Sequence, residues 1–161
     1  MNDTAATSKI RKTIAENRFF STLADDSIDF LAANAKQKRL AEGQVLFHSG
    51  DPAKNFFLLI KGHLSLEIPA IEGPALDLQD IGPGQIAGWS WLIPPNRWHF
   101  QARAHSAIEY LEFDGTAVLA HCEENPRFGY EVVMRFSALM SERLEFARQK
   151  MMAAFKPLGF A

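Results

Sequence analysis

The sequence predicts an α+β fold, mainly β, in which a closed or rolled antiparallel sheet is flanked by helices at both ends of the chain. Three observations predict it: helical spacing of apolar residues up to about residue 36, short apolar runs broken by glycine from 38 to 114, and a return of helical spacing afterwards. The chain has 161 residues, of which 47% are hydrophobic, enough for one domain with a substantial core. We therefore expect a single domain over residues 1–161.

The first segment, residues 8–36, is expected to contain two helices. Ile10 and Ile14 recur at helical spacing, and the apolar residues around Phe30 follow Asp25-Asp26-Ser27, a sequence that can cap a second helix. Between the helices lies the apolar patch Phe19–Leu23. We expect this patch to anchor both helices to the rest of the domain.

Residues 38–114 are expected to form the rolled sheet, with glycines at 43, 50, 62, 73, 82, 84 and 88 marking turns. A turn spacing of about 8–12 residues favours a closed antiparallel sheet over alternating strands and helices. Closure also protects the sheet edges. The expected strands are Gln44–His48, Phe56–Lys61, His63–Pro69, Ala75–Ile81, His99–Ala104 and Ile108–Phe113.

Residues 115–156 are expected to be helical. Asp114 can cap a short helix through Ala120, and Asn125-Pro126 is typical of a helix N-terminus. A long helix follows, which Pro157 and Gly159 are expected to end. Its apolar positions trace one face: Val133, Phe136, Met140, Leu144, Ala147 and Met151.

Composition excludes several classes of protein. A formal charge of −2 argues against a protein whose main partner is the nucleic-acid backbone, and no apolar run approaches the roughly 20 residues of a membrane span. The N-terminus lacks the apolar segment of a secretory signal, so we expect a cytoplasmic protein. The single Cys122 excludes an internal disulfide and a cysteine-based metal cluster. The five histidines show no His-x-His spacing and no catalytic triad motif is evident, so neither a metal site nor an enzyme is predicted.

Two stretches, Ala41–Ala53 and Asn55–Leu66, resemble the cyclic-nucleotide-binding domain of the catabolite-activator (Crp/Fnr-like) family. Gly82-Pro83-Gly84-Gln85-Ile86-Ala87 with the later Arg97 is similar to the phosphate-binding cassette of that family. The resemblance implies a double-stranded β-helix, also called a jelly-roll or β-roll, with N-terminal helices, a long C-terminal helix and a cassette at residues 82–104.

In that family the cassette is a loop and a short helix whose free backbone N–H groups bind a cyclic phosphate together with an arginine. The resemblance implies N–H donors at Ala87 and Gly88 and a phosphate contact from Arg97, with Arg103 as the competing arginine. Gln85 falls where the family has a ribose-binding glutamate. The implied effector is cyclic AMP or cyclic GMP, with no other cofactor. The predicted ligand-binding residues are Gly84, Gln85, Ile86, Ala87, Gly88, Arg97, Trp98 and Arg103.

The cassette also departs from the family pattern. An amide at Gln85 offers the ribose a neutral hydrogen bond, worth roughly 0.5–1.5 kcal/mol against roughly 1.5–3 kcal/mol for a charged one. Trp98 stands where the family has a small residue, and its indole could fill the pocket. Trp89, Trp91 and Trp98 all lie within ten residues of one another. Three roles are open for this cluster: core packing, an interface anchor, or a stacking surface for a planar ligand.

Three functions remain in competition. The preferred one is a stand-alone regulatory domain that binds a small anionic, cyclic-nucleotide-like ligand and signals through its C-terminal helix. It would form a homodimer through the Val133–Met151 helix and pass its signal to a protein partner that the sequence does not name. Only six residues follow Phe155, so no helix-turn-helix unit and no direct DNA binding are expected. The alternative is an interaction module of the same fold in which Trp98 fills the nucleotide site. The third is a cupin-like metalloenzyme, which the missing His-x-His disfavours.

Overall fold

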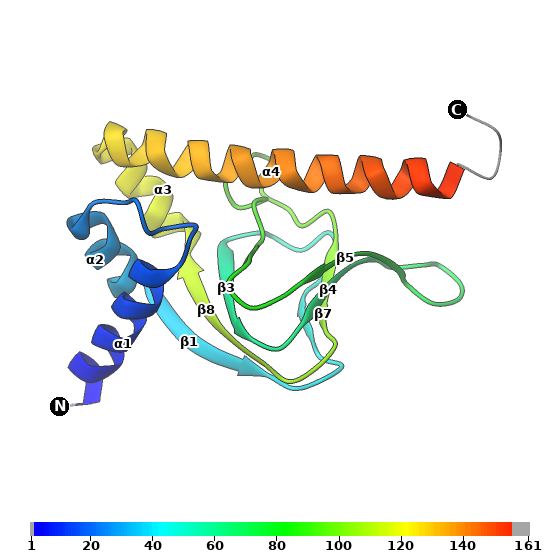
Figure 1. The fold of residues 1–161 in the computed structure, drawn as a ribbon, viewed down its shortest axis with the longest axis horizontal. Coiled ribbons are helices and arrows are strands. Elements are labelled where there is room, and N and C mark those ends of the chain that lie inside the picture. Colours follow the sequence, from blue (N-terminus) through cyan, green and yellow to red (C-terminus); the bar gives the residue numbers. More distant parts are fainter. Residues whose placement is uncertain (1, 156–161) are drawn as a thin grey trace.

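The computed structural model describes residues 2–155, which form helices at both ends of the chain and strands between them (Figure 1). The N-terminal helices are α1 (Asn2–Glu16) and α2 (Asp25–Ala33), and the C-terminal ones are α3 (Gly115–Glu124) and α4 (Pro126–Phe155). The strands are β1 (Ala35–Leu40), β2 (Val45–Phe47), β3 (Asn55–Lys61), β4 (Leu64–Ile68), β5 (Leu76–Ile81), β6 (Ile86–Ala87), β7 (Gln101–Ala104) and β8 (Ile108–Asp114).

The strands form two antiparallel four-stranded sheets. One has the order β1-β8-β3-β6 and the other β2-β7-β4-β5, so neighbours in each sheet come from distant parts of the chain. β8 contributes the centre of the first sheet through Leu111, which pairs with Leu58 of β3 on one side and with Gln37 of β1 on the other. This arrangement confirms the predicted α+β fold with a β-roll, N-terminal helices and a long C-terminal helix.

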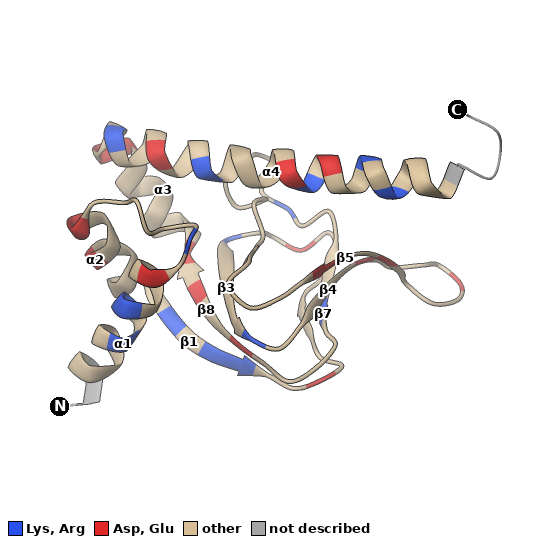
Figure 2. Ribbon diagram, viewed as in Figure 1, with Lys and Arg blue, Asp and Glu red and all other residues tan. Residues whose placement is uncertain are grey.

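Six strands form within two residues of their predicted bounds, and two were not predicted. β1 pairs along its whole length with β8, although only Ala35 at its start is buried. Its polar residues cannot show the alternation that marks a strand, and they suit an edge, where lysines discourage pairing with a second chain. Figure 2 shows the basic bands that β1 carries along the sheet edge. β6 has only two residues and gives no periodic signal.

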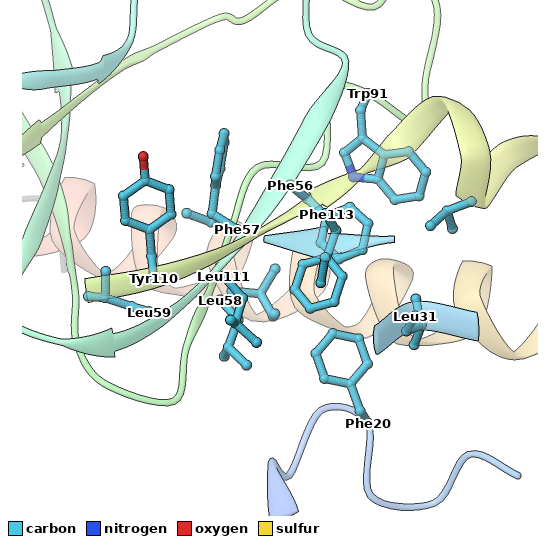
Figure 3. Packing of buried hydrophobic residues seen from close by; sticks show 14 of the residues in the cluster. Phe20, Leu31, Phe56, Phe57, Leu58, Leu59, Trp91, Tyr110, Leu111 and Phe113 are labelled. Atoms are coloured by element: carbon cyan, nitrogen blue, oxygen red, sulfur yellow. The ribbon is translucent and has the colours of Figure 1, made fainter. Parts of the chain in front are cut away.

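The core is a stack of aromatic rings between the roll and the helices. Phe56 of β3 and Phe113 of β8 are stacked with centroids 4.6 Å apart, and Trp91 lies 4.8 Å from Phe56 on its other side. Figure 3 shows these rings in line, with Phe20 approaching from the connection after α1. Phe20 lies 5.5 Å from Phe113, so the apolar patch between the first two helices anchors them to the roll as predicted.

Two of the helix starts follow the predicted chemistry and one does not. Asp114 caps α3, because its carboxylate accepts a hydrogen bond from the Ala117 N–H at 3.1 Å, and α4 begins at Pro126. α2 is preceded by Ala24, which makes no side-chain cap, so the expected capping by Asp25-Asp26-Ser27 is wrong. Asp25 and Asp26 instead lie in the first turn, where negative charge favours the helix dipole.

α4 crosses the roll, and its buried apolar contacts lie in its N-terminal half, while Lys150 near its C-terminus donates hydrogen bonds to two carbonyls of β5. Phe136 meets Phe56 and Trp91 edge-on at 5.3 and 5.1 Å, and Phe128, Val132 and Leu139 are buried on the same face. The helix end predicted at Pro157 and Gly159 lies outside the described residues. No helix within residues 2–155 combines the length and the hydropathy that a bilayer crossing requires.

We expect Phe136→Ala to lower the free energy of unfolding by about 3–5 kcal/mol, because it leaves a cavity at the junction of α4 and the roll. Phe146→Ala is the matched control, since this ring lies on the same helix and remains 43% exposed. Its cost should be clearly smaller. Urea unfolding followed by circular dichroism measures both, and equal losses would contradict the anchoring role of Phe136.

Candidate functional site

The cassette, residues 82–104, enters the roll through β6 and leaves it through β7. β6 pairs Ile86 with Leu58 and Ala87 with Phe57 of β3, and Gly88 follows with a φ of +91°. The short helix that the family resemblance implies does not form, because residues 88–100 consist of turns, bends and one isolated bridge. The N–H groups of Leu92 and Asn96 are used inside these turns. The segment therefore offers no helix N-terminus to a phosphate.

Trp98 lies inside the roll. Its side chain is buried, and the indole stacks on Phe47 of β2 with centroids 3.9 Å apart and an interplanar angle of 16°. The ring is also so close to Gly88 that a Cβ added there would lie 2.7 Å from Cη2 of the indole. The space between the indole and Gly88, lined by these three residues and their neighbours, has a volume of about 20 Å³, which is room for about one water. A separate cavity of about 450 Å³ lies against Trp98 and Phe47 and is also lined by Phe57 and Tyr110.

Arg97 faces away from the interior. Its side chain is exposed and donates a hydrogen bond from Nη1 to the Gly50 carbonyl at 2.7 Å. The backbone on either side is tied to the same loop, since the Trp98 N–H donates to the Asp51 carbonyl and the Gly50 N–H to the Trp98 carbonyl. Neighbouring residues of an extended chain point to opposite faces, so burial of Trp98 places Arg97 outside. Arg97 closes a loop here, and it does not face a ligand cavity.

Arg103 is also turned away from the interior. Its neighbours on β7, Ala102 and Ala104, are buried in the roll, so Arg103 faces the opposite side of the sheet. There it donates from Nε to Glu67 Oε2 at 3.2 Å and from Nη1 to the Gly43 carbonyl at 2.9 Å. Glu67 is buried, so the Arg103 charge is neutralised by a structural partner.

The residues before Gly88 lie in two other places. Ile86 and Ala87 are buried in β6, and Ile86 also lines a cavity between the roll and α4. Gly84 and Gln85 form the β5–β6 turn on the outside of the roll, where the Gln85 side chain accepts a hydrogen bond from the Gly82 N–H at 2.7 Å. The eight predicted ligand-binding residues are therefore not brought together around one pocket: Gly88 and Trp98 share the interior, and Gln85, Arg97 and Arg103 lie apart.

Sequence reasoning missed a cluster of arginines beneath α4. Arg135 and Arg143 line a cavity of about 610 Å³ together with Arg18, Gly84 and Gln85. Arg143 follows Phe136 and Met140 at helical spacing, on the face that packs on the roll. A charged residue at a core-facing position of an apolar helical stripe was the signal that could have identified it.

One group of possible metal ligands is found in the described part of the chain. Atoms of Glu67, Asp77 and His105 lie within 4.8 Å of one another. Glu67 Oε2 already accepts hydrogen bonds from Gln101 at 2.8 Å and from Arg103. A guanidinium beside this carboxylate opposes a second cation, so the group is explained as a polar network between strands.

Comparisons with known proteins agree with the β-roll. Residues 37–125, more than half of the chain, match the model of the cyclic nucleotide-binding domain. The fold also matches the crystal structure of a cyclic nucleotide-binding domain from Methylobacillus flagellatus with a TM-score of 0.76 and 15% identity, covering 92% of this chain and 83% of that one. The chain belongs to the cyclic nucleotide-binding domain family.

Two curated relatives are longer proteins. The chain is 33% identical over 146 residues to the acetyltransferase Pat of Mycolicibacterium smegmatis, which covers 90% of this chain and 40% of Pat. It is 23% identical over 130 residues to the cAMP-activated global transcriptional regulator CRP of Escherichia coli, covering 78% of this chain and 59% of CRP. The chain thus spans less than two thirds of either relative, and both matches include the β-roll.

The packing of Trp98 on Gly88 can be tested by adding one methyl group. Gly88→Ala combines a positive φ with a clash against the indole, whereas Gly50→Ala has nearly the same φ, +90°, and no atom within 4 Å of the new Cβ. We expect Gly50→Ala to cost about 1–2 kcal/mol of unfolding free energy, and Gly88→Ala about 1–3 kcal/mol more.

In a Trp98→Ala background the clash is gone, so the extra cost of Gly88→Ala over Gly50→Ala should vanish. Thermal and urea unfolding of the single and double variants give these numbers. An extra cost that persists without the indole would mean that Trp98 does not lie against Gly88.

Proposed function

We propose that this chain is a regulatory domain of the cyclic nucleotide-binding family whose nucleotide site is filled by Trp98, and that it works as a protein interaction module. The observation that carries the proposal is the stack of Trp98 on Phe47, which leaves about 20 Å³ between the indole and Gly88. CRP is named for activation by cAMP, whereas we propose no cyclic nucleotide effector for this chain. We also propose that this chain has no catalytic activity of its own.

Displacing the indole would be expensive. A buried aromatic side chain covers roughly 150–250 Å², which at about 25 cal/mol per Å² corresponds to about 4–6 kcal/mol. A ligand would have to spend this energy to enter, and it amounts to roughly three to four powers of ten in affinity. A nucleotide that an open roll would bind at micromolar concentration is therefore expected to bind here at millimolar concentration or not at all.

The positions of Arg97 and Arg103 also disfavour binding of a cyclic nucleotide. A cyclic phosphate carries a negative charge that must be paired or solvated when it enters a roll. Arg97 is exposed and bonded to the Gly50 carbonyl, and Arg103 is paired with the buried Glu67. Neither arginine offers its guanidinium to the interior. The counter-charge that these two arginines could supply is thus used by the protein itself.

The surface proposed for interaction is the exposed side of α4. Tyr130, Leu144 and Met151 are spaced by multiples of seven residues, and Leu144 is 73% exposed. Val133 and Met134 lie beside Tyr130 and are also exposed. A seven-residue apolar repeat is the pattern by which helices pair side by side. We propose that α4 of one copy pairs with α4 of a second copy over Val133–Met151, and that signals pass through this helix.

The nucleotide part is tested by isothermal titration calorimetry with cyclic AMP and cyclic GMP. We expect no saturable heat from the wild-type chain at up to about 1 mM ligand, and tryptophan fluorescence should stay unchanged. Arg97→Ala is the control for a cassette contact. Saturable binding below about 100 μM that Arg97→Ala abolishes would overturn the proposal and restore the nucleotide-sensing function.

The helix pairing is tested by sedimentation equilibrium. We expect a dimer for the wild-type chain and a monomer for Leu144→Lys, because a buried lysine in the helix seam cannot be solvated. Ile71→Lys is the matched control, since Ile71 is fully exposed in the β4–β5 connection, and this variant should remain a dimer. A wild-type monomer at about 100 μM, or equal behaviour of the two variants, would contradict pairing through α4.

A further inference from the structure

The cavity beneath α4 lies outside the roll and is separate from the position that Trp98 occupies. α4 forms one wall, the connection after α1 forms a second, and the β5–β6 turn forms the third. Its volume of about 610 Å³ is in the range of small-molecule sites. Phe19 and Leu139 give it apolar surface, and the charged residues around it are mostly basic.

Arg143 is the unusual group in this wall. The residue is 7% exposed, and Nη2 donates a hydrogen bond to the Ile86 carbonyl at 2.9 Å. Nη1 is buried and has no hydrogen-bond partner. Burial lowers the pKa of Arg143, because the charged form loses its hydration. A buried guanidinium with an unused nitrogen is costly unless an anion or a further acceptor meets it.

Two more guanidinium groups belong to the same cavity. Arg135 donates to the carbonyls of Phe19 at 2.9 Å and Glu131 at 3.0 Å and to the Thr22 hydroxyl, and two of its five N–H groups remain. Arg18 is exposed and has no ion pair with any residue in the described range 2–155. Glu142 is the acidic residue lining the cavity, so three arginines face one carboxylate. Figure 2 shows basic bands on α4 and on the connection after α1.

We propose that this cavity binds a small organic anion, with a phosphate or carboxylate group held by Arg143 and Arg18 and an apolar part resting on Phe19 and Leu139. Guanidinium groups suit both anions because their N–H donors form paired, charge-assisted hydrogen bonds. Glu142 disfavours a highly charged ligand, which favours one anionic group on an apolar body. The proposal does not depend on whether the roll binds nucleotides.

Occupancy would also have a structural consequence. The three walls are the long helix, the connection between α1 and α2, and the β5–β6 turn of the roll, and a bound anion would contact all of them. A ligand that binds best when α4 is docked stabilises the docked position by its difference in affinity. The cavity is therefore placed to regulate α4 without any ligand inside the roll.

The proposal is tested by calorimetric titration of the full chain with phenyl phosphate and benzoate at constant ionic strength, with phenol as the neutral probe. We expect saturable binding of phenyl phosphate, benzoate or both, and none of phenol; the tighter anion identifies the class of ligand. Arg18→Gln and Arg143→Lys should each weaken binding about tenfold or more, the value of one charge-assisted hydrogen bond. Arg127→Gln, an exposed arginine of α4 outside the cavity, should leave it unchanged.

Arg143 is buried, so its variant can lose stability as well as affinity. Ala138→Trp therefore provides a second route, because Ala138 lines the cavity on the exposed side of α4 and an indole there fills the space without removing a charge. This variant should abolish phenyl phosphate binding while its circular dichroism spectrum stays unchanged. No saturable binding to the wild-type chain at up to about 10 mM, or equal affinity in wild type, Arg18→Gln and Ala138→Trp, overturns the proposal.

Discussion

The contact between the Trp98 indole, the Phe47 ring and the backbone at Gly88 determines what the inside of this β-roll can hold. The three groups come from β2, from the segment after β6 and from the segment before β7, so the contact joins both sheets of the roll. It needs a glycine at position 88, because a Cβ there would overlap the indole. A closed sheet normally leaves an interior that must be filled by side chains or by a ligand. Here the Trp98 indole fills the part of the interior that lies beside Gly88.

The same contact accounts for the direction of Arg97. Once Trp98 is inside, extended geometry turns residue 97 outward, where its guanidinium finds the Gly50 carbonyl and fastens the cassette to the loop after β2. Inward rotation of Arg97 would have to expel the indole and break the backbone hydrogen bonds that tie residues 96 and 98 to residues 50, 51 and 53. The cassette is thus a packed structural segment. Arg97 acts within it as a structural residue that holds the cassette to this loop.

Much of the fold could be predicted from the sequence because its signals are local. Glycine-bounded runs identified six strands, and the spacing of Phe136, Met140 and Leu144 identified the long helix. β1 was not predicted, because an edge strand with one buried residue has no apolar alternation. For the site, the sequence named Trp98 as the residue that could fill the pocket but could not say which of Arg97 and Trp98 points inward. Alternation makes neighbours face opposite ways, and only the contact with Phe47, 51 residues away in the chain, decides between them.

The position of Trp98 changes where a bound ligand could act on α4. In a roll with an open interior, a ligand next to β6 could act on α4 directly, since Arg143 already bonds the Ile86 carbonyl across that junction. With Trp98 packed beside Gly88, the junction between β6 and α4 has its charged groups on the outer side, where Arg18, Arg135 and Arg143 line one cavity. Phe136 fixes one end of this junction in the aromatic core. Beyond Leu139, by contrast, the helix is held by hydrogen bonds from Arg143 to the Ile86 carbonyl and from Lys150 to two carbonyls of β5. The Arg143 guanidinium keeps an unpaired nitrogen, so this part of α4 is the part that a bound anion would stabilise most.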